Sequence, residues 1–225
     1  MSEVTSLLQE AVQHHQEGRL EAARAGYAAI LRAAPENADA HHLSGLIAFQ
    51  EGDYPKALAL IDAAIARQPD AAMYHGNRGR VLKAAGSNAQ ASAAFGHALS
   101  LQPGDPALLS DLAGAHVDGG NPDAAIVFAR RAIELAPELA SAHHNQGLAA
   151  AALGQLPSAR LAFEQALELD PAFAPALFEL GRIHQDENNT EKAEIYYRRA
   201  VAVEPLMHEA HVNLGNILRT RMALE

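Results

Sequence analysis

The chain has 225 residues, of which 49% are hydrophobic and 5% aromatic, and it contains no cysteine and no tryptophan. The absence of cysteine excludes disulfides, thiolate zinc sites and cysteine nucleophiles. With 17 basic and 27 acidic residues, the formal net charge is −10, which disfavours nucleic acids and anionic membranes as general partners.

The N-terminal residues MSEVTSLLQE show no basic segment followed by an apolar run, so a signal peptide is not predicted. The sequence has no stretch of about 18 uninterrupted apolar residues, so a transmembrane helix is not predicted either. From these two features we expect a soluble, cytoplasmic protein.

A proline recurs every 34 residues along almost the whole chain. The six prolines are Pro35, Pro69, Pro103, Pro137, Pro171 and Pro205. A fixed period of this length is typical of a helical solenoid, in which each repeat packs against its neighbours only.

A glycine or asparagine lies 17 residues before each proline, at Gly18, Gly52, Gly86, Gly120, Gly154 and Asn188. Both residue types accept a positive φ, which predicts that a first helix ends there in a left-handed cap. N-cap residues of a second helix are expected at Asp53, Asn121 and Thr190, and the proline then stops that helix. Each repeat is therefore predicted to be a hairpin of two helices, each of about 14 residues.

Small residues recur at the positions where the two helices of a hairpin must approach closely. They are Ala11, Gly45, Gly79, Ala113, Gly147 and Gly181, then Ala23, Ala57, Ala91, Ala125, Ala159 and Ala193, and then Ala64, Ala98, Ala132, Ala166 and Ala200, with Ile30 in the first repeat. A larger apolar residue lies eight positions before each proline, at Tyr27, Ile61, Phe95, Phe163 and Tyr197, with Ala129 as the exception.

These columns, and segments such as AFEQALELDPAFA, resemble the tetratricopeptide repeat over essentially the whole chain. The resemblance implies an all-α fold, a right-handed superhelix of helix-turn-helix repeats. A single array over residues 1–225 is expected, with repeats at roughly 4–37, 38–71, 72–105, 106–139, 140–173 and 174–207 and a first helix at 208–225. Because no second helix follows residues 208–225, we expect the chain to be a fragment of a longer protein.

One column departs from the family pattern. The bulky residue near the start of each first helix, often tryptophan in the family, is here Leu7, His41, His75, Leu109, His143, Leu177 and His211. We interpret these histidines as substitutes for the bulky packing residue. Neighbouring histidines on a helix diverge by about 100°, so a shared metal ion is not expected, and no cofactor is predicted.

A polar column lies two residues before the small position in the later repeats, at Asn77, Asp111, Asn145, Glu179 and Asn213. Residues two apart on a helix point about 200° apart, so this column faces away from the hairpin seam. On the same face lie Arg80, Lys83, Arg182 and Asn216. In the resembled family this face lines the concave groove, where carboxamides both donate and accept hydrogen bonds.

Asn77, Asn145 and Asn213, with the segment AHVNLGN, also resemble the arrays of O-linked N-acetylglucosamine transferases and their bacterial relatives. In those arrays an asparagine ladder holds the protein substrate, whereas Asp111 and Glu179 depart from that ladder. The competing interpretation is a column of merely solvated polar residues.

The sequence has no Gly-rich phosphate loop, no G-x-S-x-G and no H-E-x-x-H, so we do not expect an enzyme in this chain. We expect a protein–protein interaction module that binds a protein or extended peptide in the concave groove. The alternative is the N-terminal substrate-recognition domain of a larger bacterial protein glycosyltransferase, whose ligand is a glycosylation substrate. A third hypothesis is a homodimer formed through the open solenoid ends.

Overall fold

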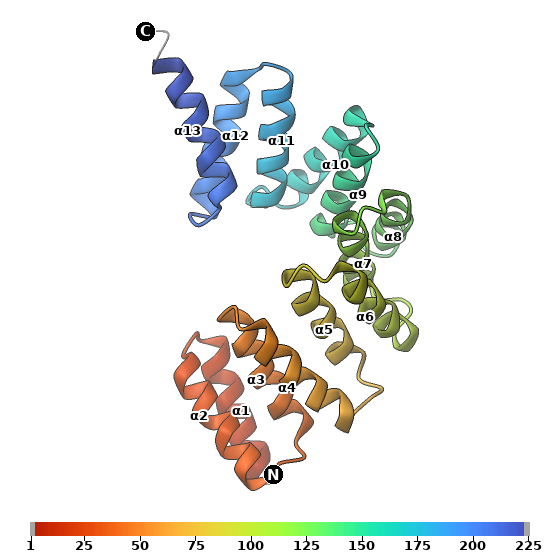
Figure 1. The fold of residues 1–225 in the computed structure, drawn as a ribbon, viewed down its shortest axis with the longest axis vertical. Helices are drawn as coiled ribbons and strands as arrows, with labels where there is room; N and C mark the ends of the chain where they lie inside the picture. The colour runs from red at the N-terminus through yellow and green to blue at the C-terminus, as the bar shows by residue number, and fades with distance from the viewer. Residues whose placement is uncertain (1–2, 223–225) are drawn as a thin grey trace. The chain divides into compact units, whose positions relative to one another are not determined.

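The computed structural model describes residues 3–222, and in this range the chain forms thirteen helices joined by turns (Figure 1). The helices are α1 (Glu3–Gln16), α2 (Leu20–Ala33), α3 (Ala38–Gln50), α4 (Tyr54–Arg67), α5 (Ala72–Ala84), α6 (Asn88–Leu101), α7 (Pro106–Asp118), α8 (Pro122–Leu135), α9 (Ala140–Ala152), α10 (Leu156–Leu169), α11 (Ala174–Asp186), α12 (Thr190–Val203) and α13 (His208–Met222). Their lengths confirm the expected hairpins of two helices. None of the helices in the described part of the chain is long and apolar enough to cross a membrane.

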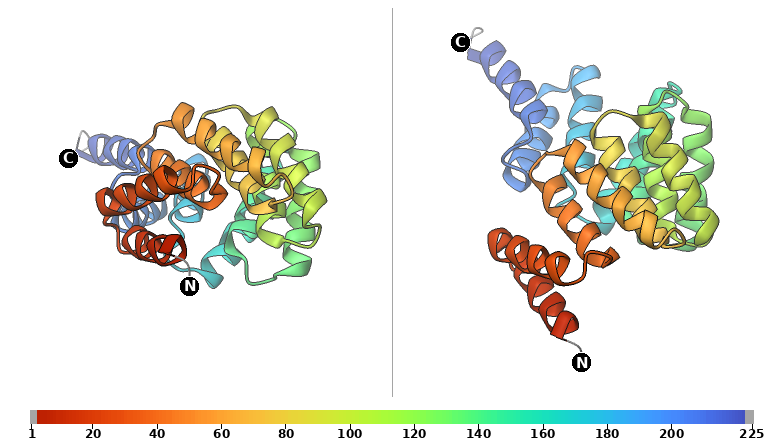
Figure 2. Two further views of the ribbon diagram at one scale, coloured as in Figure 1. Left: turned by 90° about the horizontal axis from the view of Figure 1, so that it is seen from below. Right: turned by 60° about the horizontal axis from the view of Figure 1, so that its bottom comes forward.

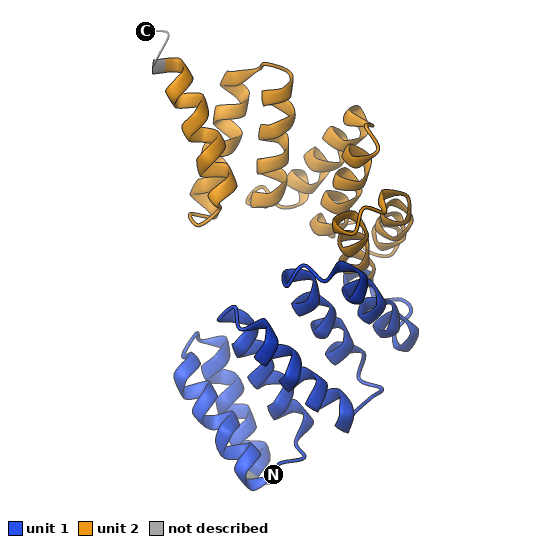
Figure 3. Ribbon diagram, viewed as in Figure 1, with its two compact units in different colours: residues 1–108 blue, residues 109–225 orange. Residues whose placement is uncertain are grey.

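The helices belong to two compact units, unit 1 (residues 1–108) and unit 2 (residues 109–225) (Figure 3). In unit 1, α1 packs against α2, α3 against α4 and α5 against α6. In unit 2, α9 packs against α10 and α11 against α12 (Figure 2). Within each unit, neighbouring hairpins meet where the second helix of one contacts the first helix of the next, as α4 does with α5 and α10 with α11.

The turn inside each hairpin is closed by a residue with positive φ, as the glycine column predicts. The φ angles lie between 72° and 77° at the five glycines and equal 58° at Asn188. At the α9–α10 turn, the Gly154 N–H donates to the Ala151 carbonyl at 2.9 Å and the Gln155 N–H donates to the Ala150 carbonyl at 2.9 Å. This pair of bonds satisfies the last carbonyls of the first helix, as in a Schellman cap.

Three second helices, α4, α8 and α12, begin at a side-chain cap, and the sequence predicted two of these caps correctly. Asp53 accepts a hydrogen bond from the Lys56 N–H at 3.1 Å, and Asn121 accepts one from the Ala124 N–H at 3.4 Å. The prediction of Thr190 as an N-cap is wrong, because Asn189 caps α12 by accepting from the Lys192 N–H at 3.2 Å. The cap directly follows the positive-φ residue in each case, and Thr190 lies one residue too late.

The seam of every hairpin except α7–α8, where Ala129 takes the place of the large residue, pairs a small residue or Gly with a large one. A Cβ atom added to Gly147 would lie 2.5 Å from Cε1 of Phe163, and one added to Gly181 would lie 2.5 Å from Cε1 of Tyr197. Phe163 and Tyr197 are themselves completely buried. Glycine in the first helix therefore provides the space that the ring of the second helix fills.

The prolines lie where the period predicts, just beyond the second helices. Each second helix from α2 to α12 ends two residues before its proline, for example α2 at Ala33 before Pro35 and α12 at Val203 before Pro205. Proline lacks an N–H and disfavours helical conformation in the residue before it, so the helix stops there.

Candidate functional site

The polar residues predicted to bind a ligand lie on first helices, and we call the surface they form within each unit the first-helix face of that unit. Unit 1 contributes Asn77, Arg80 and Lys83 from α5, and unit 2 contributes Asp111 from α7, Asn145 from α9, Glu179 and Arg182 from α11, and Asn213 and Asn216 from α13. Most of these side chains are half-buried, whereas Arg182 and Asn216 are exposed.

In unit 1, Asn77 is bound on both ends of its carboxamide. Its Oδ1 accepts from Nη1 of Arg80 at 2.7 Å, and its Nδ2 lies 2.7 Å from Nε2 of His42 on α3. Because Oδ1 already serves Arg80, the amide nitrogen donates to His42, and the proton of the neutral imidazole resides on Nδ1. Burial lowers the pKa of His42 to about 4, although the nearby Asp39 carboxylate partly opposes the shift.

In unit 2, Asn145 makes the equivalent link between successive first helices. Its Nδ2 donates to the Ser110 backbone carbonyl at 2.8 Å and to the Ser110 hydroxyl at 3.0 Å. Ser110 is buried, and its hydroxyl also lies 3.1 Å from that of Ser141. Asn77 and Asn145 therefore each hold together two first helices, a structural role that the sequence interpretation did not include.

Glu179 and Arg182 form an ion pair on α11. Nη1 of Arg182 donates to Oε2 of Glu179 at 3.0 Å, and the Glu179 side chain is 12% exposed against 51% for Arg182. Burial raises the pKa of Glu179, and the Arg182 guanidinium opposes this shift. The pair therefore keeps its carboxylate inside and presents its positive charge outward.

The polar column ends in a small network that links α11, α12 and α13. Nδ2 of Asn213 donates to the Tyr197 hydroxyl at 3.2 Å, which in turn donates to Oε1 of Gln185 at 2.9 Å. Oδ1 of Asn216 accepts from Nη2 of Arg219 at 3.3 Å. All three asparagines of the predicted ladder thus use their amide nitrogen within the protein.

Lys83 and Asp111 complete the predicted set. Both are half-buried, and each already interacts with another residue of the described chain. They therefore add charge to the first-helix face without being free of partners.

Four histidines have a role that the sequence analysis missed. Nε2 of His41, His75, His143 and His211 lies 2.9, 2.7, 2.8 and 3.0 Å from the carbonyl oxygens of Pro35, Pro69, Pro137 and Pro205, respectively. A carbonyl can only accept, so each histidine donates its Nε2–H and fastens the turn before its own helix. The signal was present in the sequence, because each of these histidines follows its proline by six residues.

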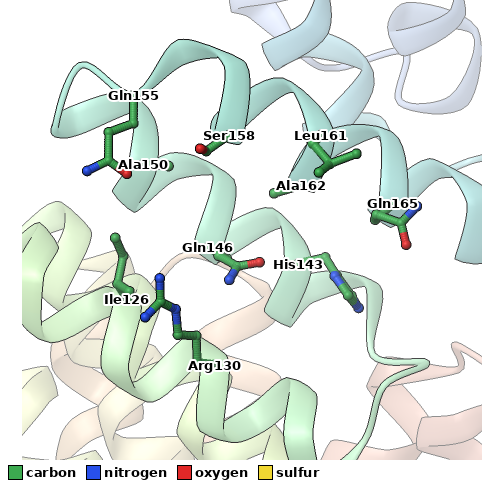
Figure 4. A pocket seen from close by; sticks show the side chains of 10 residues that line it. All are labelled: Ile126, Arg130, His143, Gln146, Ala150, Gln155, Ser158, Leu161, Ala162 and Gln165. Carbon is green, nitrogen blue, oxygen red and sulfur yellow. The ribbon is translucent and has the colours of Figure 1, made fainter.

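A cavity that no sequence pattern indicated lies away from the first-helix face. It measures about 500 Å³ and opens between α8, α9 and α10 of unit 2 (Figure 4). The second helices α8 and α10 provide its walls, and none of the first-helix face residues lines it.

Comparison with family models assigns nearly all of the described chain to one kind of repeat. Two models described as tetratricopeptide repeat match residues 8–72 and 82–148. A third, described as the Cilia and flagella-associated protein 70 middle TPR-like domain, matches residues 118–220.

Among curated proteins, the chain is similar to the Protein O-mannosyl-transferase TMTC3 of Homo sapiens, with 28% identity over 189 residues. The match covers 82% of this chain and 21% of that protein, so the chain spans about a fifth of the length of this relative.

Among solved structures, the chain is similar to a chain of the APC/C hetero-tetramer Cut9-Hcn1, with a TM-score of 0.82, 18% identity and coverage of 96% of this chain and 43% of that one. The type IV pilus biogenesis factor PilW gives a TM-score of 0.80 at 20% identity, covering 95% of this chain and all of that one (100%). YrrB, described as a TPR protein with an unusual peptide-binding site, gives 0.56 at 24% identity, covering 82% and 95%. At these identities the likeness concerns the fold alone.

Proposed function

Because this chain is a tetratricopeptide repeat protein, we propose that it is a protein-interaction module that binds an extended segment of a partner protein on its first-helix face. The observation that carries the proposal is the arrangement in unit 2, where successive first helices present polar side chains already held by hydrogen bonds. Asn145 is held by Ser110, Glu179 by Arg182 and Asn213 by Tyr197. Side chains that are fixed in advance lose little conformational entropy when a ligand binds.

The unused hydrogen-bond acceptors and the exposed charge of these side chains define which groups a ligand must present. Within residues 3–222, no donor reaches the Oδ1 atoms of Asn145 and Asn213, so both oxygens are available to backbone N–H groups of an extended peptide. The exposed guanidinium of Arg182 favours a carboxylate in the same segment. The expected ligand is therefore an extended, acidic peptide segment.

The test uses peptides selected from a phage-displayed library of random linear peptides panned on the full chain. Binding of the synthetic peptides, followed by fluorescence anisotropy, should weaken about tenfold in Arg182→Gln, because a charge-assisted hydrogen bond is lost. Asn213→Ala should also weaken binding. Arg198→Gln, which removes an arginine paired with Glu194 on α12, is the control and should bind as the unmodified chain does. If none of the selected peptides binds more weakly to Arg182→Gln or to Asn213→Ala, the proposal is contradicted.

Asn145→Ala separates the binding role from the structural one. The substitution removes the two hydrogen bonds to Ser110, so we expect the free energy of unfolding to fall by about 1–2 kcal/mol in addition to any loss of peptide affinity. Urea denaturation measures the first effect and anisotropy the second.

A second candidate function is favoured by the similarity to a protein O-mannosyl-transferase. In this second function, the chain recognises the protein substrates of a larger protein glycosyltransferase, and the same first-helix face binds the acceptor polypeptide. Reading the gene on both sides of residues 1–225 tests it: a glycosyltransferase domain in the same frame supports this function, and stop codons that leave no room for such a domain contradict it.

A further inference from the structure

The cavity between α8 and α10 has a floor and two walls made by three consecutive helices. His143, Gln146 and Ala150 of α9 form the floor, while Arg130 of α8 and Leu161 of α10 stand on opposite walls (Figure 4). Its volume of about 500 Å³ lies within the range of sites that hold small ligands or inserted side chains. All of these residues belong to unit 2.

The cavity exists because this repeat has small or polar residues where the next repeat has large ones. Exactly one period later, 34 residues on, Leu177, Leu180 and His184 replace His143, Gln146 and Ala150, and Tyr196 replaces Ala162. Leu177, Leu180 and His184 are buried, and the ring of His184 stacks on that of Tyr196 with centroids 5.4 Å apart. The junction of α10, α11 and α12 is thus filled by the chain's own side chains. The junction of α8, α9 and α10 is left open, as is the equivalent junction of α4, α5 and α6 in unit 1, which holds a cavity of about 460 Å³.

The open junction is positively charged in an acidic protein. No acidic side chain lines the cavity, and Arg130, which is exposed, makes no hydrogen bond or ion pair with any residue of the described chain. The adjacent Arg131, by contrast, is paired with Glu134 at 2.8 Å. With a net charge of −10 on the chain, an unpaired arginine beside a cavity is complementary to a carboxylate.

One wall of the cavity carries a large apolar side chain. Leu161 on α10, which lines the cavity, is 60% exposed. The equivalent residues of unit 1 are the alanines Ala25, Ala59 and Ala93. Large apolar side chains left in water beside a cavity favour an apolar occupant.

We propose that this cavity is a second peptide-binding site, separate from the first-helix face. Its occupant is a segment of a partner protein that inserts an apolar side chain between α8 and α10 and places a neighbouring carboxylate against Arg130. The carboxamides of Gln146 and Gln165 on the two sides of the cavity supply hydrogen bonds to the peptide backbone.

Two substitutions test the site in the full chain. Arg130→Gln removes the charge, and Ala162→Tyr fills the cavity with the side chain that the next repeat carries at Tyr196. Arg131→Gln is the matched control, because it removes the neighbouring arginine of the same helix. Gln146→Leu, which reproduces Leu180, fills the cavity from a second position and replaces Ala162→Tyr if circular dichroism shows that the latter loses helicity.

The probes are peptides selected from a phage-displayed library of random linear peptides panned on the unmodified chain. We expect one group of selected peptides to share an apolar residue next to Asp or Glu, and to bind about tenfold more weakly to Arg130→Gln and to the filled variant. Their affinity for Arg131→Gln and Arg182→Gln should be unchanged.

Other outcomes overturn the proposal. If the selected peptides all lose affinity in Arg182→Gln and Asn213→Ala but not in Arg130→Gln, the first-helix face alone binds peptides. If peptides of the expected composition bind the filled variants as tightly as the unmodified chain, or if no such peptides are selected, the cavity is not a binding site. The function proposed for the first-helix face is tested separately in the same experiment, by Arg182→Gln and Asn213→Ala.

Discussion

At the scale of the residue, His42 couples the first-helix face to pH. The imidazole is 1% exposed, accepts a hydrogen bond from Asn77 and packs against the ring of Tyr74 with centroids 4.6 Å apart. A protonated imidazole has no lone pair at Nε2, so protonation would remove the hydrogen bond from Asn77. His42 is accordingly neutral in the folded chain over the physiological range.

This arrangement predicts a loss of stability in acid. Because the pKa of His42 falls from 6.5 to about 4 on folding, the unfolded chain binds a proton that the folded chain does not between these two values. The full stability is present above pH 6.5 and decreases as the pH falls toward 4, by at most about 3 kcal/mol. Urea denaturation across this range should show a shallower pH dependence for His42→Gln, which cannot titrate. Equal pH dependence in the two proteins would show that His42 is not the group responsible.

A second prediction concerns the glycine at the hairpin seam. Gly147→Ala would place a methyl group 2.5 Å from the buried ring of Phe163. We expect this overpacking to lower the free energy of unfolding by about 1–3 kcal/mol, which exceeds the stabilisation of roughly 1 kcal/mol that alanine gives through its higher helix propensity. Gly215→Ala is the matched control, since Gly215 has the same repeat position and an added Cβ meets nothing within 4 Å. Thermal unfolding should show a lower Tm for the first variant and an unchanged or higher Tm for the second.

At the scale of the element, the hairpin turn depends on backbone conformation more than on packing. An added Cβ would meet nothing within 4 Å at Gly18, Gly52, Gly86, Gly120 or Gly154, so glycine is needed at these positions for its positive φ rather than for space. The four proline carbonyls that accept from histidines stabilise the other turn, between one hairpin and the next.

Substitutions of Asn188 test whether the positive φ, rather than packing, controls the stability of the hairpin turn. Asn188→Gly should preserve or slightly raise the free energy of unfolding, because glycine adopts the observed φ of 58° without steric cost. Asn188→Ala should lower it by about 1–2 kcal/mol, the cost of the left-handed conformation for a residue with a Cβ. Chemical denaturation of both variants decides the point, and equal stabilities would mean that packing governs the turn instead.

At the scale of the whole molecule, stability comes from contacts between neighbours in the sequence. α13 contributes Ala210 to a cluster with Leu177 and Ala200, and Ile217 to a cluster with Ala193 and Tyr197. In an array of repeats, the loss of such an interface affects the adjacent repeat first. That the repeats form one continuous array over residues 1–225 stays a prediction.

Removal of residues 208–225 should therefore destabilise α11 and α12 selectively. Burial of the Ile217 side chain alone contributes about 2 kcal/mol or more to the free energy of unfolding, and this contribution would be lost. Hydrogen exchange should show faster exchange of amides in α11 and α12, with protection of α1 to α6 maintained. An equal loss of protection in α1 to α6 would contradict a stability built from neighbouring interfaces.

The elements of this fold could be predicted from the sequence because local chemistry sets them. A proline just beyond a helix stops it, a glycine with positive φ closes a turn, and a column of alanines such as Ala125, Ala159 and Ala193 allows two helices to approach. The partners of the polar column could not be predicted in this way. Asn77 and Asn145 meet His42 and Ser110, each 35 residues earlier, and only packing of one repeat on another brings these side chains within 3 Å. The cavity beside Arg130 likewise depends on the summed volume of side chains from three helices, which becomes visible only when α8, α9 and α10 are assembled.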